Sequence, residues 1–367
     1  MRSFKSVLLA AVAAVALVPG ASHAADPAPY RTVWDDFSHG FTVDSATAKW
    51  FYFGAGPYTG NDGVVTTDQN GLKVVSPGSN PHTGEPAFTL TLAPDSQNGG
   101  LPGGLDHVKW LAYANHSASS GYPGFDAVPG QVLSCEGWIS GRTYGTQFQP
   151  FGSGVENAND DLRLAAFAQN QIDFETFMVF DFFVTNETVY AFYERLPFGR
   201  GPQLGENYAA FSFQIPVARR GINDTSHLKL SYDRAAGTVR WYVNSREVFK
   251  VDRIGYRIDR KYLTLDHGGV ERLISPRQLD CGMGTFTLLD AYRPTDIGLV
   301  KIGDGAIRYF NPDYGAPVLS PFVDPESKAS NRLFGQGALL REKRVVVSSK
   351  IAHRAGDHDD EDQSGDD

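Results

Sequence analysis

The 367-residue sequence predicts an all-β protein folded as an antiparallel β-sandwich. Three observations support this prediction. The chain contains 39 glycines and 21 prolines, and 12% of its residues are aromatic, which is typical of many short strands joined by tight turns. Apolar and polar residues alternate in short segments bounded by Gly, Asn, Asp or Pro. No window of more than ten residues keeps the period of an amphipathic helix.

The N-terminus has the features of a secretory signal peptide. Arg2 and Lys5 precede an apolar run over residues 7–18, and small residues lead to Ala24. We expect cleavage after Ala24 and an extracellular protein. The apolar run is shorter than the ~20 residues that a membrane-spanning helix needs, and no later segment approaches that length. The sequence therefore predicts a secreted chain with no membrane span.

Negative charge is concentrated at the C-terminus. The formal net charge is −9, and residues 351–367 hold seven acids and one arginine. The rest of the chain is only mildly acidic, so it lacks the basic patch by which proteins bind nucleic acid. The tail has no aromatic residue, and we expect it to be disordered. The predicted organisation is a signal peptide (1–24), a single sandwich domain (25–350) and a disordered acidic tail (351–367).

The expected strands are short runs rich in β-branched or aromatic residues that end at turn residues. The last two expected strands, 333–340 and 345–347, should return beside the first strand and close the sandwich. Residues 76–127 are mostly turn clusters, which predict long loops that contain Trp110. In chain order, the expected strands are 32–37, 50–53, 63–65, 71–75, 88–92, 130–140, 162–168, a hairpin over 172–195, 210–215, 227–232, 239–243, 247–251, 284–292, 333–340 and 345–347.

The hairpin over residues 172–195 carries the strongest pattern. A turn at Thr185–Thr188 pairs Asp181 with Phe192 and Val179 with Glu194. Because successive side chains leave opposite faces of a strand, a slip by one residue would mix the two faces, and the pattern supports this register. One face is then apolar. The other combines acids with aromatic rings: Asp173, Glu175, Phe177, Asp181, Phe183, Tyr190, Phe192 and Glu194.

Carboxylates among aromatic rings on an open sheet face suit a polysaccharide ligand. The rings stack on the apolar faces of sugars, and the carboxylates accept hydrogen bonds from hydroxyl groups. The sequence therefore predicts a carbohydrate-binding protein. The alternative is a structural or envelope-associated protein in which this face is only solvated. The expected substrate-binding residues are Asp173, Phe177, Tyr190 and Phe192 from the hairpin and Trp110 from the loops.

Two of these acids also form a candidate catalytic pair. Asp181 and Glu194 are diagonal neighbours, with backbones ~7–8 Å apart. Carboxyl groups of glycosidases lie ~5–9 Å apart, so the pair has suitable spacing for a glycoside hydrolase or lyase. Glu175 is a third candidate. The alternative is a polar face in which an acid is neutralised by Arg195 or a lysine.

Several segments resemble known families. The run SYDRAAGTVRWYVNSREVFKV, residues 231–251, resembles the back hairpin of concanavalin-A-like jelly rolls, and the order of motifs near Asp36, Trp50 and Gly71 resembles their start. The resemblance implies a jelly-roll sandwich. Residues 190–200 and 332–337 also resemble an uncharacterised family of secreted bacterial proteins, which supports secretion and the sandwich without assigning an activity.

The segment Gln171-Ile172-Asp173-Phe174-Glu175 resembles the Glu-x-Asp-x-Glu strand of the laminarinase and licheninase family of retaining glycosidases. In that family the first Glu is the nucleophile, the Asp orients it and the last Glu is the acid/base. Gln171 stands at the nucleophile position, and an amide cannot attack an anomeric carbon. The resemblance therefore implies that this family's mechanism is absent here.

The two cysteines are expected to pair. Cys135 and Cys281 are the only ones in the chain, and two cysteines of a secreted protein most often form a disulfide. Two separate buried thiols are the alternative. The sequence indicates no cofactor. Asp35-Asp36 and residues 157–161 offer oxygen ligands for a structural Ca²⁺, although Asn and Asp at such positions more often cap turns.

Overall fold

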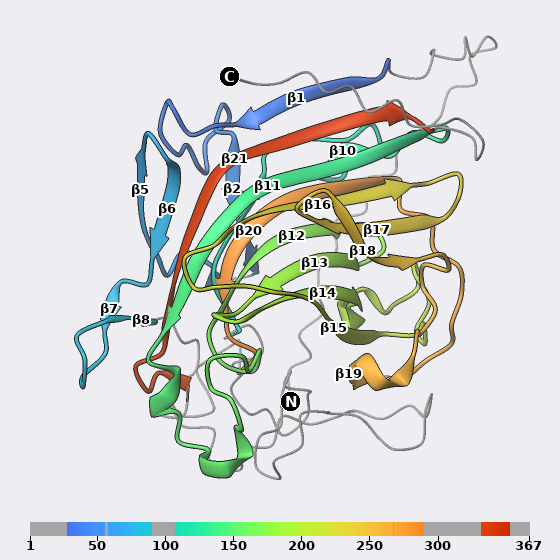
Figure 1. Ribbon diagram of the computed structural model, residues 1–367. Coiled ribbons are helices and arrows are strands. Elements are labelled where there is room, and N and C mark those ends of the chain that lie inside the picture. Colours follow the sequence, from blue (N-terminus) through green and yellow to red (C-terminus); the bar gives the residue numbers. More distant parts are fainter. Residues whose placement is uncertain (1–27, 56–57, 90–106, 267, 290–331, 353–367) are drawn as a thin grey trace, which may run out of the picture.

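The computed structural model describes residues 28–55, 58–89, 107–266, 268–289 and 332–352, and it consists of two antiparallel sheets packed face to face (Figure 1). The eight-stranded sheet has the order β18-β17-β16-β11-β21-β6-β5, with β1 paired to β21. Its strands are β1 (Tyr30–Asp35), β5 (Val64–Asp68), β6 (Gly71–Val75), β11 (Gln131–Tyr144), β16 (Thr225–Asp233), β17 (Thr238–Val243), β18 (Arg246–Val251) and β21 (Gly337–Ile351).

The nine-stranded sheet has the order β19-β15-β14-β13-β12-β20-β9-β2, with β10 paired to β20. Its strands are β2 (Trp50–Tyr52), β9 (Val108–Ala114), β10 (Phe125–Asp126), β12 (Ala166–Asp173), β13 (Met178–Val184), β14 (Thr188–Arg195), β15 (Phe211–Arg219), β19 (Leu263–Asp266) and β20 (Gln278–Phe286). Two small ribbons, β3 (Gly54–Ala55) with β4 (Tyr58–Thr59) and β7 (Gly78–Ser79) with β8 (Pro86–Ala87), and 3₁₀ turns η1 (Thr146–Phe148), η2 (Gly152–Gly154), η3 (Pro197–Gly199) and η4 (Arg260–Tyr262) complete the described elements. The predicted all-β antiparallel sandwich is confirmed.

The main core lies between the two sheets. Alternate residues of each strand point into it, so that Phe180 of β13 packs against Tyr232 and Trp241 of the opposite sheet. Burial of each such ring contributes about 2–3 kcal/mol. The Trp241 Nε1–H donates to the Asp181 carbonyl oxygen at 3.0 Å, so the indole is also satisfied as a donor.

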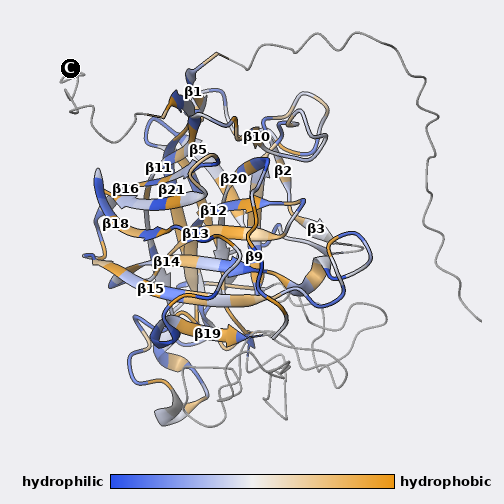
Figure 2. Cartoon of the chain, turned by 90° about the vertical axis from the view of Figure 1, so that its right-hand side faces the viewer, coloured by the Kyte–Doolittle hydropathy of each residue, from blue (hydrophilic) through white to orange (hydrophobic). Residues whose placement is uncertain are grey.

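The nine-stranded sheet is buried on its other face as well. A second apolar cluster covers that face and includes Val179, Phe183, Phe192, Leu265 and Phe286. In Figure 2 orange, hydrophobic segments mark β13 and β19, as expected for strands with apolar neighbours on both sides. This second cluster decides the surroundings of the acidic side chains on the sheet, because they share its face.

The disulfide between Cys135 and Cys281 is confirmed. Cys135 lies on β11 and Cys281 on β20, so the bond ties the two sheets together across the core. Both half-cystines are buried.

The predicted hairpin of residues 227–243 is confirmed as β16 and β17. The predicted continuous strand over residues 172–183 is wrong, because the chain turns between β12 and β13. The Asp173 carboxylate accepts hydrogen bonds from the Glu175 backbone N–H at 3.0 Å and from the Thr176 hydroxyl, and Phe177 takes a φ of 60°. An aspartate that caps its own turn in this way ends the strand.

Two late strands also differ from the prediction. The strand expected at 284–292 lies at Gln278–Phe286, and residues 290–331 lie outside the described residues. Gly282 and Gly284 fall on one face of that strand, so the sequence shows no alternation of apolar and polar side chains there. The expected pair 333–340 and 345–347 is one strand, β21, of 15 residues, which lies beside β1 as predicted and runs next to the 14-residue β11 (Figure 1).

Both ends of the chain extend beyond the described residues. Residues 1–24, expected as a signal peptide, and nearly all of the expected tail lie outside the described residues. No helix in the described part of the chain is long and apolar enough to cross a membrane.

Candidate functional site

The predicted register of the β13–β14 hairpin is confirmed. Asp181 pairs with Phe192 and Val179 pairs with Glu194, and the Thr185 N–H donates to the Thr188 carbonyl oxygen at 3.0 Å across the turn. Asp181 and Glu194 therefore lie diagonally on the face of the nine-stranded sheet that points away from the main core. We call this the outer face.

Asp181 is held firmly on the outer face. The Asn170 Nδ2 and the Gln171 backbone N–H each donate to its carboxyl group at 2.7 Å. Burial nevertheless raises the pKa of Asp181 well above its ordinary value, and the negative charge of Glu194 raises it further, while the two hydrogen bonds act in the opposite direction. This carboxyl group favours its protonated form far above the ordinary range of an aspartate.

Asp280 and Tyr113 complete an acid cluster with Asp181 and Glu194. Asp280 is fully buried, and within the described residues no hydrogen bond of normal geometry reaches either carboxyl oxygen. Burial raises its pKa well above the ordinary value, and the backbone N–H groups of Cys281 and Ala114 offset only part of this. Burial is the main cause that raises the pKa of Tyr113, and the charges of Asp181, Asp280 and Glu194 add to it, so its phenol lies within electrostatic range of all three carboxyl groups.

Glu194 is the most accessible acid of this cluster. It is partly exposed and accepts a hydrogen bond from the Ser212 hydroxyl of β15. Its pKa is raised by burial and lowered by Ser212 and by His107. Asp280 and Tyr113 carried no signal that sequence reasoning recognised, since they meet only through the pairing of β9 with β20. Gly282 is the one sequence feature linked to this contact, because a Cβ atom there would collide with the Tyr113 ring.

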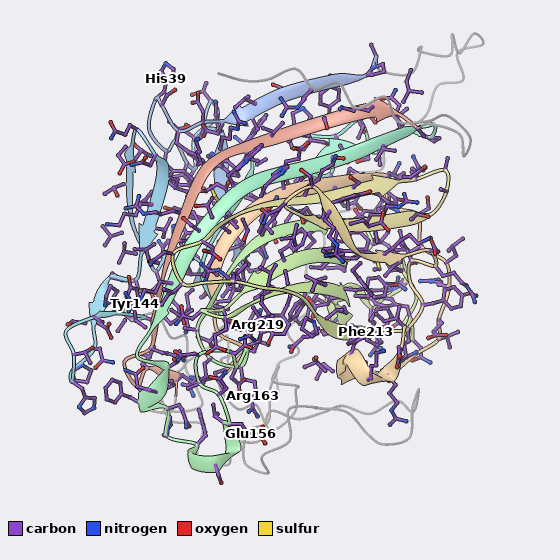
Figure 3. All side chains as sticks on the ribbon, in the orientation of Figure 1. His39, Tyr144, Glu156, Arg163, Phe213 and Arg219 are labelled. Carbon is purple, nitrogen blue, oxygen red and sulfur yellow. A yellow bond between two sulfur atoms is a disulfide. The ribbon has the colours of Figure 1, made fainter. Side chains whose placement is uncertain are left out.

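A pocket of about 350 Å³ opens beside the hairpin, over β14, β15 and β19. Tyr190 and Tyr262 supply two aromatic walls. The Gln214 Nε2 is buried and has no hydrogen-bond partner within the described residues. Figure 3 shows Glu156 and Arg163 near one another at the lower edge of the sandwich. We call this the tyrosine pocket, and its lining is Glu156, Asn157, Asp160, Asp161, Leu162, Arg163, Tyr190, Gln214, Pro216, Lys261, Tyr262, Leu263 and Thr264.

The two aspartates of the tyrosine pocket are already paired. Asp160 accepts hydrogen bonds from the hydroxyls of Thr185 at 2.6 Å and Thr188 at 2.8 Å, and from Arg219 at 3.1 Å. Asp161 binds the guanidinium of Arg163 through both carboxyl oxygens. These contacts make the aspartates part of a rigid wall that offers acceptor oxygens, and they leave neither as a free base.

Most of the other predicted site residues lie elsewhere. Asp173 caps the turn after β12 and faces the inter-sheet side, as does Gln171, which pairs with Cys281 of the main core. The predicted alignment of Gln171, Asp173 and Glu175 on one sugar-facing strand is therefore wrong. Glu175 lies in the turn, where Arg277 donates to it at 2.6 and 2.8 Å and keeps its pKa below the usual value.

The expected stacking residues behave differently from one another. Trp110 lies on β9 in the main core and not in a loop, so its predicted place beside a groove is wrong. Phe192 is buried against Phe183, with ring centroids 4.4 Å apart. Phe177 lies against Gly199 at the turn. Of the five expected binding residues, Tyr190 alone lines the tyrosine pocket.

The residues expected as calcium ligands make local contacts. Asp35 accepts from the Phe37 N–H at 2.9 Å and from the Trp50 Nε1–H at 2.7 Å, and Asp36 accepts from Ser38. Within the described ranges no group of three or more His, Cys, Asp or Glu side chains is arranged to hold a metal ion.

Comparison with known proteins places the chain in a family. The family of unknown function DUF6081 matches residues 34–351. This chain belongs to that family. A relative is an uncharacterised protein of Acanthamoeba polyphaga mimivirus, 31% identical over an alignment of 402 positions that covers 86% of this chain and 87% of the viral protein. The expectation of a specifically bacterial family is not supported, because this relative is viral.

Several solved structures resemble the family member described here. The κ-carrageenase of Pseudoalteromonas carrageenovora is 12% identical, with a TM-score of 0.35 over 90% of this chain and 99% of that one. A structure described as a native glycosidic hydrolase is 8% identical, with a TM-score of 0.36 over 87% and 94% of the two chains. A carbohydrate-binding module from Bacillus subtilis is 10% identical, with a TM-score of 0.27 over 67% and 96%. At these scores the likeness assigns no activity to this chain.

Proposed function

We propose that this protein is an extracellular carbohydrate-binding protein whose ligand occupies the tyrosine pocket. The observation that carries the proposal is the combination in one pocket of two tyrosine walls, paired carboxylates and the unpartnered amide of Gln214. A sugar presents an apolar C–H face and a rim of hydroxyls, so rings and fixed polar groups together match it. The volume of about 350 Å³ lies within the range of small-ligand sites.

The disulfide supports the extracellular location. Cys135 and Cys281 are buried and joined between the sheets, and such bonds persist in oxidising compartments. The expected signal peptide leads to the same location.

Replacing Gln214 or Tyr262 with alanine is expected to weaken glycan binding at least ~10-fold. Each change removes a hydrogen bond or an aromatic wall, and about 1.4 kcal/mol corresponds to a tenfold loss of affinity. The mature secreted protein would first be screened on an array of polysaccharides, and the strongest hit measured by calorimetry. Gln203→Ala and Tyr242→Ala are the matched controls, since Gln203 is exposed in a loop and Tyr242 lies on the other sheet.

Three outcomes separate the interpretations. Weaker binding in both pocket variants and unchanged binding in both controls supports the proposal. Unchanged binding in the pocket variants moves the ligand to another surface. Absence of any glycan binding by the wild type would contradict the proposal and favour a structural role.

The acid cluster favours glycoside hydrolysis or a lyase reaction as a second candidate. A carboxyl group with a raised pKa keeps its proton near neutral pH and can donate it to a leaving oxygen. Asp181 and Asp280 have this property. Both are buried, however, so a substrate reaches them only if the second apolar cluster opens, which is why binding is the first proposal.

If the cluster is catalytic, Asp181→Asn and Glu194→Gln should each lower turnover by at least ~100-fold, because general acid–base catalysis contributes about that much. Analysis of released oligosaccharides from every array hit would measure this. Wild-type rates should fall as the pH rises through the raised pKa of the proton donor. Binding without released product would exclude the catalytic interpretation for those glycans and leave the binding proposal intact.

A further inference from the structure

The guanidinium of Arg195, at the end of β14, is buried without a partner. The residue is 1% exposed, and within the described ranges its Nε, Nη1 and Nη2 atoms have no hydrogen-bond acceptor. No carboxylate of the described residues lies at ion-pair distance from it. A buried cation is normally paired and hydrogen-bonded, because its removal from water costs several kcal/mol. The missing partner of Arg195 therefore needs an explanation.

Arg195 lies over the ring of Tyr208, and two other arginines lie in the same region. The Arg195 guanidinium carbon lies 3.9 Å from the centroid of the Tyr208 ring, and that of Arg200 lies 5.6 Å from it. Arg272 also acts on Tyr208 and on Arg195 through its charge. It is exposed, and a Cβ atom at Gly205 would lie 3.4 Å from its Nη2. Arg272 thus gives the arginine group a side that faces solvent.

The geometry around Tyr208 is rigid. Its hydroxyl donates to the Leu196 carbonyl oxygen at 2.6 Å and accepts from the Gly199 N–H at 3.0 Å. Arg200 donates to the carbonyl oxygens of Tyr208 at 2.8 Å and Gly268 at 3.0 Å. These contacts hold the ring and the second guanidinium in place before any ligand binds, which lowers the cost of ordering a site.

Two acids of this region are bound by a fourth arginine. Arg257 binds Asp266 at 2.7 Å and Glu271 at 3.4 Å. Burial lowers the pKa of Arg195 to about 10; Tyr208 and Tyr193 act in the opposite direction, and the charges of Arg272 and Arg200 add to the lowering. Three guanidinium groups therefore gather around Tyr208, and that of Arg195 has no hydrogen-bond partner among the described residues.

We propose that Arg195, Arg200 and Arg272 form an oxyanion-binding site against the Tyr208 ring. Guanidinium groups bind sulfate, phosphate and carboxylate groups through paired hydrogen bonds, and a ring beneath Arg195 fixes the plane of its fork. The oxyanion comes either from a free inorganic ion or from an acidic group on a polysaccharide. The site goes beyond the proposed carbohydrate function and stands independently of the tyrosine pocket.

Sulfate is the probe for the first experiment. The thermal unfolding of the full mature chain would be followed with sodium sulfate added at constant ionic strength, balanced by sodium chloride. Sulfate also raises the melting temperature of most proteins by exclusion from their surface, without saturation. The proposal predicts a saturable rise of about 3 °C, because a ligand that binds only the native state stabilises it with a hyperbolic concentration dependence.

Arg195→Met and Arg272→Met are expected to abolish the saturable part of the shift. Arg272 is exposed, so its variant should fold even if loss of Arg195 disturbs packing. Arg246→Met, an exposed arginine on β18 of the other sheet, is the control and should respond like the wild type. A shift that does not saturate, or one that persists unchanged in Arg272→Met, would overturn the site.

A second arm identifies the source of the oxyanion. Binding of a sulfated galactan and a polyuronate would be compared with binding of the neutral galactan. Preference for an acidic polymer, lost in Arg272→Met and reversed by free sulfate, assigns the site to a polysaccharide group. A saturable sulfate shift without any polymer preference assigns it to a free ion. Gln214→Ala should keep the sulfate shift, so failure of the tyrosine pocket and failure of this site are distinguishable.

Discussion

Replacing Cys135 and Cys281 together with alanine is expected to lower the free energy of unfolding by about 5 kcal/mol. The two residues are 146 positions apart in the sequence, so their bond closes a long loop and removes much conformational freedom from the unfolded chain. The bond also joins β11 to β20 and so crosses between the sheets. Denaturant unfolding of the variant and the wild type measures the difference.

The control for this prediction is the wild type unfolded in the presence of a reductant, which breaks the same cross-link without changing side-chain volume. Both samples should lose stability by similar amounts. A loss below about 1 kcal/mol in both would show that the cross-link contributes little, and that packing of the two sheets alone accounts for the stability.

The stability of the wild type is expected to fall as the pH rises from about 5 to 8, and Glu342→Gln should remove much of this fall. Glu342 lies on β21 and is fully buried in the eight-stranded sheet. Burial raises its pKa from 4.5 to about 8, although the backbone N–H groups of Trp138 and Arg344 act in the opposite direction. Gly137 makes room for the carboxyl, since a Cβ atom there would lie 3.0 Å from both of its oxygens.

The direction of the effect follows from proton binding. Between the pKa of the unfolded chain and that of the native state, the native state binds more protons, so the free energy of unfolding decreases with increasing pH. A shift from 4.5 to about 8 corresponds to about 4–5 kcal/mol above pH 8, at about 1.4 kcal/mol per pKa unit. A glutamine stays neutral, and it keeps an acceptor for the Trp138 N–H, which donates to Glu342 Oε1 at 2.8 Å.

Denaturant unfolding at several pH values would test this second prediction, with Glu206→Gln as the control at an exposed position. Asp181 and Asp280 act in the same direction, so the wild type and both variants should all retain some pH dependence. The difference between Glu342→Gln and the wild type isolates Glu342. Parallel stability curves for these two proteins would contradict the prediction.

The sequence alone determined the sandwich and the register of its central hairpin. Alternation of side chains has a period of two, so the pairing of Asp181 with Phe192 and Val179 with Glu194 follows from residues close together in the chain. The pairing of Cys135 with Cys281 could also be predicted, because no other cysteine competes. These features depend on local pattern or on composition.

Tertiary structure decided what surrounds each acid. The sequence placed Asp173 and Asp181 on one face, but a turn capped by the Asp173 side chain separates them. A hydrogen bond from a side chain to the backbone produces no periodic pattern of residues, so the sequence did not reveal this turn. Asp280 joins Tyr113, and Arg195 joins Arg272, only through strands and loops that are distant in the chain. Burial and charge depend on such distant neighbours, so the acid cluster, the tyrosine pocket and the arginine site emerge only when the sheets are assembled.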